Sequence, residues 1–178
     1  MPRLFTGLEV PSQTGLMLSL LRGGLRGARW IDTENYHITL RFIGDIDDRT
    51  ADEIAHALER VNRNPIEIQI RGLDVFGGNR PHCLIAKIEH NQALSELQAE
   101  LERILQRLGL PPERRKYTPH ITLARLRGTT SIEVADWLSQ RGEFNAPGYV
   151  AGRFVLFSAK ASIGGGPYLV EEAYPLAA

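Results

Sequence analysis

One tetrapeptide, His-Ile-Thr-Leu, occurs twice in this chain of 178 residues, and it limits the possible folds more than any other feature. The copies begin at residues 37 and 120, so they lie 83 positions apart, close to half the chain length. Each copy sits in a run typical of a β-strand and has an amphipathic helical pattern nearby. A repeat at this separation predicts a duplicated fold whose halves are related by a pseudo-twofold axis.

Alternation along an extended strand sorts these residues into two faces, because residues i and i+2 point the same way. The apolar side chains expected to be buried against a helix are Ile38, Leu40, Phe42, Ile121 and Leu123. The opposite face of the first copy carries His37, Thr39 and Arg41. If the two halves meet about a pseudo-twofold axis, both His-Thr faces line one cleft.

The rest of the chain interleaves strand and helix patterns. Strands are expected at residues 3–10, 36–44, 66–70, 82–89, 119–126, 153–160 and 168–174, the last two as a hairpin around the glycines at 164–166. Helices are expected from residue 12 to the glycines at 23–24, from 47 or 48 to Pro65, at 92–108 and at 131–140. This order predicts an α+β, bilobal fold of mostly antiparallel sheets flanked by helices around a central cleft, with residues 1–178 as a single two-lobed domain.

Composition excludes several classes of protein. The 21 basic and 21 acidic side chains cancel, which disfavours a protein that coats nucleic acid through a general positive field. The single cysteine, Cys83, excludes a disulfide scaffold and a cysteine-based zinc module, and favours a cytoplasmic location. No apolar stretch approaches the roughly 18 residues of a membrane span, so no membrane association is expected.

Two histidines and two threonines on one cleft can perform acid–base chemistry at phosphorus. Imidazole titrates near pH 6.5, so a facing pair could hold one neutral and one protonated ring. The hydroxyls of Thr39 and Thr122 could hold phosphate oxygens between His37 and His120, without metal or cofactor. A cation is also needed, and we select Arg125 from a basic cluster that also contains Arg114, Arg115, Lys116 and Arg127. Strict alternation would place Arg125 on the buried face, so Arg125 can reach the cleft only if the strand has a bulge or ends before it.

Two other interpretations of the histidines stay open. A single histidine in a strand is usually a hydrogen-bonded structural residue, and we keep a structural or surface role for His56, His82 and His90. A metal site is the sharper competitor, because imidazole is a common metal ligand. Neither copy of the repeat, however, has a carboxylate or cysteine two or three residues from its histidine on the same face, whereas catalytic zinc usually has three protein ligands.

The strings HITLRFIG, PHITLAR, RLFTGLEV and SAKASIGGGPY resemble the two-histidine phosphoesterase superfamily, and within it the bacterial and archaeal RNA 2′,3′-cyclic phosphodiesterases once named 2′-5′ RNA ligases. The resemblance covers nearly the whole chain, and its paired His-x-Thr motif is the specific part. It implies a bilobal α+β fold with a central cleft. It also implies hydrolysis of a 2′,3′-cyclic phosphate at an RNA 3′ end to a 2′-phosphate, without metal or nucleotide. Separately from the resemblance, we expect the protein to be a monomer.

The resemblance also implies a role for each motif residue. His37 would be the general acid that protonates the departing ribose oxygen, and His120 the general base that activates water. Thr39 and Thr122 would bind phosphate oxygens, with a charge-assisted contact from Arg125. Phe5 and Phe42 could stack on a base, although core packing is the favoured role for both. The segment 77–82 is less typical of the family.

The sequence leaves alternatives within this chemistry. The same site could act on another cyclic phosphate, such as a small cyclic nucleotide or an ADP-ribose cyclic phosphate. It could run in the joining direction as a 2′-5′ RNA ligase. It could also bind RNA ends without catalysis, with the histidines only holding phosphate.

Overall fold

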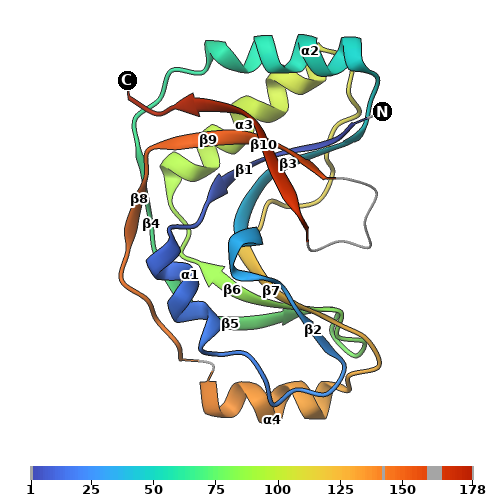
Figure 1. The fold of residues 1–178 in the computed structure, drawn as a ribbon, viewed down its shortest axis with the longest axis vertical. Coiled ribbons are helices and arrows are strands. Elements are labelled where there is room, and N and C mark those ends of the chain that lie inside the picture. The colour runs from blue at the N-terminus through green and yellow to red at the C-terminus, as the bar shows by residue number, and fades with distance from the viewer. Residues whose placement is uncertain (1, 142, 160–165, 178) are drawn as a thin grey trace.

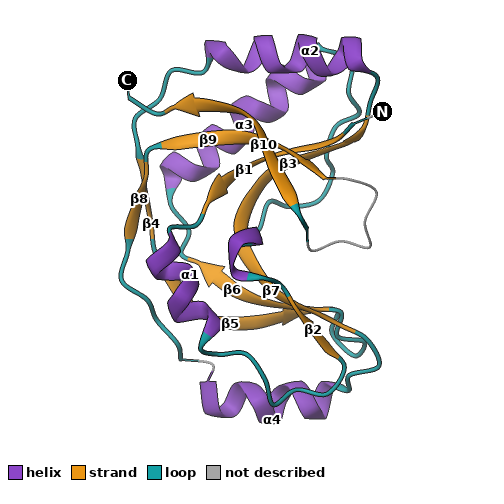
Figure 2. Ribbon diagram, viewed as in Figure 1, coloured by secondary structure: helices purple, strands orange, loops and turns teal. Residues whose placement is uncertain are grey.

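The computed structural model describes residues 2–141, 143–159 and 166–177, in which four α-helices alternate with ten strands (Figures 1 and 2). The first half of the chain forms β1 (Arg3–Glu9), α1 (Ser12–Ser19), β2 (Ala28–Trp30), β3 (His37–Asp45), α2 (Asp48–Ala57), β4 (Ile66–Ile68) and β5 (Ile70–Phe76). The second half forms β6 (Cys83–Ile88), α3 (Gln92–Arg107), β7 (His120–Leu126), α4 (Ser131–Arg141), β8 (Tyr149–Ala151), β9 (Arg153–Ala159) and β10 (Tyr168–Pro175).

Most strands belong to one antiparallel sheet with the order β10-β9-β1-β3-β7-β6-β5, and β2 adds to β7. The short strands β4 and β8 pair with each other in a second sheet. The repeated strands β3 and β7 meet at the centre, where Ile38 pairs with Ile121. These findings confirm the α+β class and the mostly antiparallel sheet.

The duplication extends far beyond the tetrapeptide. Four pairs of elements begin 83 residues apart: β3 and β7 at 37 and 120, α2 and α4 at 48 and 131, β4 and β8 at 66 and 149, and β5 and β9 at 70 and 153. The two halves also exchange equivalent strands, because β5 pairs with β6 of the second half and β9 pairs with β1 of the first. In Figure 1 α2 and α3 cover one end of the molecule and α4 the other, which gives the expected two lobes.

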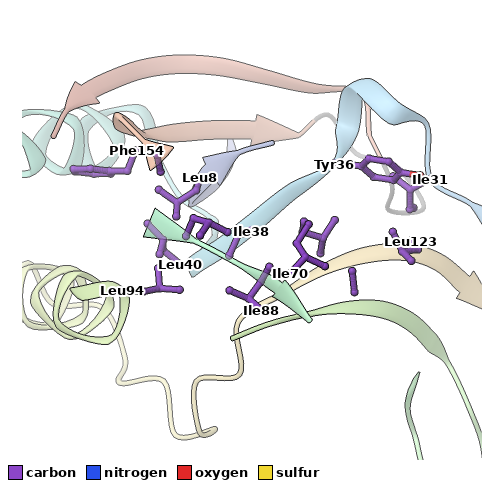
Figure 3. Close-up of a cluster of buried hydrophobic side chains, with 14 of the residues drawn as sticks. Leu8, Ile31, Tyr36, Ile38, Leu40, Ile70, Ile88, Leu94, Leu123 and Phe154 are labelled. Atoms are coloured by element: carbon purple, nitrogen blue, oxygen red, sulfur yellow. The ribbon is translucent and has the colours of Figure 1, made fainter. Parts of the chain in front are cut away.

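The hydrophobic core runs through both lobes. Figure 3 shows Leu8, Ile38, Leu40 and Phe154 among the side chains that fill it, and all four are buried. The apolar stripe of α3 is buried as its periodicity predicts, through Leu94, Leu97, Leu101 and Leu105. Ile38 and Ile121 are fully buried, so the centre of the sheet is fixed by packing on the face away from the histidines.

Several element boundaries differ from the sequence prediction. The first helix ends at Ser19, before the predicted glycines. The predicted strand 66–70 is divided at Gln69 into two strands that belong to different sheets. The side-chain amide Nε2 of Gln69 donates to the backbone oxygen of Ala146. The three-residue strands β2 and β8 were not predicted, because such short segments show no readable alternation. The pairing of β9 with β10 is confirmed, whereas Lys160 and the glycines at 164 and 165 lie outside the described residues. Within the described ranges, no helix has the length and apolar character needed to cross a membrane.

Candidate active site

The two repeated strands carry the same irregularity at the same position. Between β1 and β3 the register shifts so that Leu40 is the extra residue, and between β6 and β7 the extra residue is Leu123. Each is therefore the fourth residue of its tetrapeptide, directly after the threonine. A bulge of this kind reverses the alternation beyond it, so the next side chains change faces.

The first bulge corrects two predictions. Phe42, expected in the core, is 48% exposed and lines a cavity, whereas Arg41, expected on the histidine face, is only 6% exposed. The backbone N–H of Arg41 donates to the hydroxyl of Thr6, and its guanidinium forms an ion pair with Glu102 at 2.5 Å. A regular period of two placed Arg41 and Phe42 on the wrong faces because an apolar pattern does not reveal one extra residue.

The second bulge turns Arg125 toward the same cavity, which occupies about 370 Å³. His37, Thr39, His120 and Thr122 also line it, so all five predicted site residues border one cavity. Phe42 and Arg125 occupy equivalent positions, each five residues after the histidine of its motif. The two copies therefore give the cavity a common His-Thr pair but contribute an aromatic ring from one strand and a guanidinium from the other.

Both imidazole rings are held in the same way. Nδ1 of His37 lies 2.9 Å from the backbone oxygen of Asn35, and Nδ1 of His120 lies 2.7 Å from that of Thr118. A carbonyl can only accept, so Nδ1 of each ring carries the proton and Nε2 is left for other partners. Nε2 of His37 lies 3.0 Å from the hydroxyl oxygen of Thr39.

Aromatic side chains contact both rings. The ring of His37 lies 4.9 Å from that of Phe5 and 5.0 Å from that of Tyr168, measured between centroids. The ring of His120 meets Phe76 edge to face at 4.8 Å. Phe5 is buried, as the core interpretation expected. These contacts fix the imidazoles and exclude water from part of each ring.

Burial lowers the pKa of both histidines below the ordinary value. The pKa of His37 falls to about 4, chiefly through burial and further through the nearby charges of His120 and Arg125, although the Asn35 carbonyl opposes the shift. The pKa of His120 is lowered by burial and by Arg125, against the opposing effect of the Thr118 carbonyl. The lowered pKa favours the neutral form of both rings at pH 7, and a bound anion would favour the protonated form.

The hairpin between β5 and β6 supplies residues that the sequence did not single out for the site. Phe76 and His82 line the cavity, although we kept a structural or surface role for His82. Cys83 is buried there, with its sulfur 3.7 Å from the hydroxyl oxygen of Thr122. Arg115, which belonged to the predicted basic cluster, also lines the cavity and pairs with Glu113. Nothing in the local pattern of this hairpin distinguishes it from an ordinary turn, so its contribution required the fold.

The cavity offers hydroxyl, imidazole and guanidinium groups to a ligand. Within the described part of the chain, no three His, Cys, Asp or Glu side chains gather as they would around a metal ion. Neutral and cationic hydrogen-bond donors of this kind suit a small anion such as phosphate.

Comparison with known proteins finds a matching family and similar relatives. The sequence model of a family described as "LigT like Phosphoesterase" matches residues 8–84 and 87–167. Relatives named RNA 2′,3′-cyclic phosphodiesterase include one from Aeropyrum pernix, 36% identical over 57% of this chain and 59% of the relative. Another, from Aquifex aeolicus, is 33% identical over 56% of this chain and 55% of the relative. These alignments thus span less than two thirds of the relatives' own length.

Solved structures share the fold over the full chain. E. coli LigT complexed with 3′-AMP superposes with a TM-score of 0.79, at 19% identity, covering 99% of both chains. A structure from Thermus thermophilus gives a TM-score of 0.79 at 22% identity, covering 98% of this chain and 97% of the other. At this identity the likeness establishes the architecture alone.

Proposed function

Because this chain belongs to the LigT-like phosphoesterase family, we propose that it opens the 2′,3′-cyclic phosphate at an RNA 3′ end and leaves a 2′-phosphate. The observation that carries the proposal is the pair of identically anchored imidazoles, His37 and His120, that border one cavity together with two hydroxyls and a guanidinium. The names of the curated relatives support the same substrate class.

In the proposed reaction, His120 Nε2 accepts a proton from water while the water oxygen attacks phosphorus. The bond between phosphorus and O3′ breaks, and His37 Nε2 delivers its proton to O3′, which leaves a 3′-hydroxyl and a 2′-phosphate. The antiparallel pairing of Ile38 with Ile121 brings Thr39 toward His120 and Thr122 toward His37. The two hydroxyls are thus suited to hold nonbridging oxygens while Arg125 offsets their growing charge.

The substrate itself supplies the condition for acid catalysis. His37 is neutral in the free protein because its pKa lies at about 4. A phosphate anion beside the ring favours the protonated form and raises that pKa, so the general acid is charged when the substrate is bound. The anchoring carbonyl of Asn35 accepts from Nδ1 in either state, so protonation at Nε2 does not disturb the ring's orientation.

Turnover of a nucleoside 2′,3′-cyclic phosphate in the presence of EDTA tests this function. We expect His37→Ala and His120→Ala each to lower kcat by at least about 10²-fold, with little loss of stability. Near-normal rates for either variant would contradict the assignment, and binding without turnover would favour an RNA-end binder. Identification of the product separates the two acid–base assignments, because a 2′-phosphate requires O3′ to leave.

A further inference from the structure

A second groove adjoins the catalytic cavity and has no role in the reaction proposed above. It occupies about 370 Å³ and shares with the cavity Thr39, Phe42, Phe76, His82, Arg115 and His120. Beyond these shared residues it is bordered by Gln98 of α3 and by Lys116, Tyr117 and Thr118 of the segment that leads into β7. A ligand in the cavity can therefore continue into the groove along a common wall.

The groove is lined by aromatic side chains that other contacts do not fully cover. Phe42 is 48% exposed because the bulge at Leu40 turns it away from the core, and Phe76 is partly exposed beside His120. Phe42 and Phe76 therefore give the groove aromatic surface that a ligand can contact. Stacking of a nucleobase on an aromatic ring strengthens binding and tolerates any base, because every base has an aromatic face.

The groove also carries positive charge. Arg115 and Lys116 both border the groove, and Glu113 contributes a carboxylate to its lining. Glu113 is engaged by Arg115, whose Nε lies 3.1 Å from its Oε1. Lys116 is exposed and has no ion-pair partner among the described residues. One uncompensated ammonium beside aromatic rings matches the phosphate and base of a nucleotide.

Each of the two spaces matches one nucleotide in size, since small-ligand sites commonly occupy about 300–1,000 Å³. We propose that the groove binds the nucleotide on the 5′ side of the cyclic phosphate, so that the protein acts on oligonucleotide ends in preference to free nucleoside cyclic phosphates. This inference rests on the proposed function. Lys116 contacts the internucleotide phosphate, and the aromatic wall accepts the penultimate base.

Kinetics on two substrates test the proposal. The probes are adenosine 2′,3′-cyclic phosphate and the dinucleotide ApA that ends in the same cyclic phosphate, both with EDTA. We expect kcat/KM to be at least about 10-fold higher for the dinucleotide, because one stacked base and one phosphate contact together exceed 1.4 kcal/mol. Lys116→Gln should lower kcat/KM for the dinucleotide about 3–10-fold, reduce its salt dependence and leave the mononucleotide unchanged.

Arg114→Gln is the matched control. Arg114 is exposed two positions before Lys116, and it is not among the residues that border the cavity or the groove. The Arg114→Gln substitution removes one positive charge from the same segment as Lys116→Gln. Because Arg114 does not border the groove, the substitution should leave the ratio of kcat/KM for the two substrates unchanged. Equal kcat/KM for both substrates in the unmodified protein, or equal losses in the two variants, would overturn the groove's role. Turnover of neither substrate would instead overturn the proposed function.

Discussion

Replacing Arg41 with methionine is expected to destabilise the protein and also to misplace His120. The guanidinium of Arg41 pairs with Glu102 at 2.5 Å and donates to the backbone oxygens of Pro111, at 2.5 Å, and Phe42, at 2.7 Å. Glu102 in turn accepts from the backbone N–H of Glu113 at 2.8 Å. The pair therefore ties β3 and α3 to the segment 108–119, which leads into β7 at His120.

The size of the effect follows from the burial of the pair. The side chains of Arg41 and Glu102 are 6% and 15% exposed, and removing one partner of a buried pair typically costs about 3–5 kcal/mol. Methionine keeps the length of the side chain but removes the cation that pairs with Glu102 and the donor to the carbonyl of Pro111, so the carboxylate of Glu102 keeps only neutral donors. The freed segment also carries the Thr118 carbonyl that orients His120, so we expect kcat to fall at least about 10-fold, because small displacements of a catalytic group are costly.

Arg63→Met provides a matched control, because Arg63 and Arg41 both pair with glutamates of α3. Arg63 pairs with Glu100 of α3 at 2.5 Å, but its side chain is 28% exposed, so its removal should cost only about 1 kcal/mol. Urea unfolding gives the stability of each variant, and kcat is measured where both are folded. Replacing Arg41 and Glu102 together by Met and Leu should recover part of the stability, because no unpaired charge remains. The reasoning is refuted if Arg41→Met loses no more stability than Arg63→Met, or if kcat is unchanged.

Three further predictions follow from the site and the sheet. Binding of inorganic phosphate at pH 7 should take up a proton, because the anion raises the pKa of His37 from about 4. Calorimetry in buffers of different ionisation enthalpy measures the number of protons taken up. Proton uptake that persists in His37→Asn would contradict the assignment to this ring. The free energy of unfolding should fall by about 2 kcal/mol from pH 7 to pH 5, since unfolded His37 binds a proton that the folded ring refuses. This loss of stability, measured by urea unfolding at both pH values, should be smaller in His37→Asn. An equal loss in His37→Asn and the unmodified protein would exclude His37 as the cause. Gly7→Ala should lower the free energy of unfolding by about 1–3 kcal/mol and also lower kcat, because a Cβ at this position would lie 2.7 Å from the backbone oxygen of Ile38. Gly152→Ala is the control, because no atom lies within 4 Å of its added Cβ, and thermal unfolding should show no change in its stability.

The sequence predicted the fold well where a pattern was long or repeated. The amphipathic stripe of α3 and the paired tetrapeptides required only regular periodicity, and they led to the α+β class and to the duplication. Strand β5 was missed beyond residue 70 because Arg71, Gly72 and Asp74 interrupt its apolar residues.

Strict alternation predicted the faces of the side chains within each tetrapeptide and failed directly after the first one. Bulges at Leu40 and Leu123 decide which of the following side chains enter the cavity, and a backbone irregularity leaves no mark in an apolar pattern. Arg125 was expected there only on the condition of a bulge, while Arg41 and Phe42 were assigned by strict alternation. His82 and Phe76 come from a hairpin whose position beside β7 depends on long-range pairing.

The exchange of β5 and β9 explains how two matching motifs came to differ. A half-length chain with this topology would complete its sheet only by lending the strand equivalent to β5 and β9 to an identical copy, and such a symmetric dimer would present the same side chains from both sides. Joining the copies in one polypeptide removes that symmetry requirement. Phe42 and Arg125 could then diverge at equivalent positions, as could Arg41 and Ala124, so one side can recognise a base while the other recognises charge.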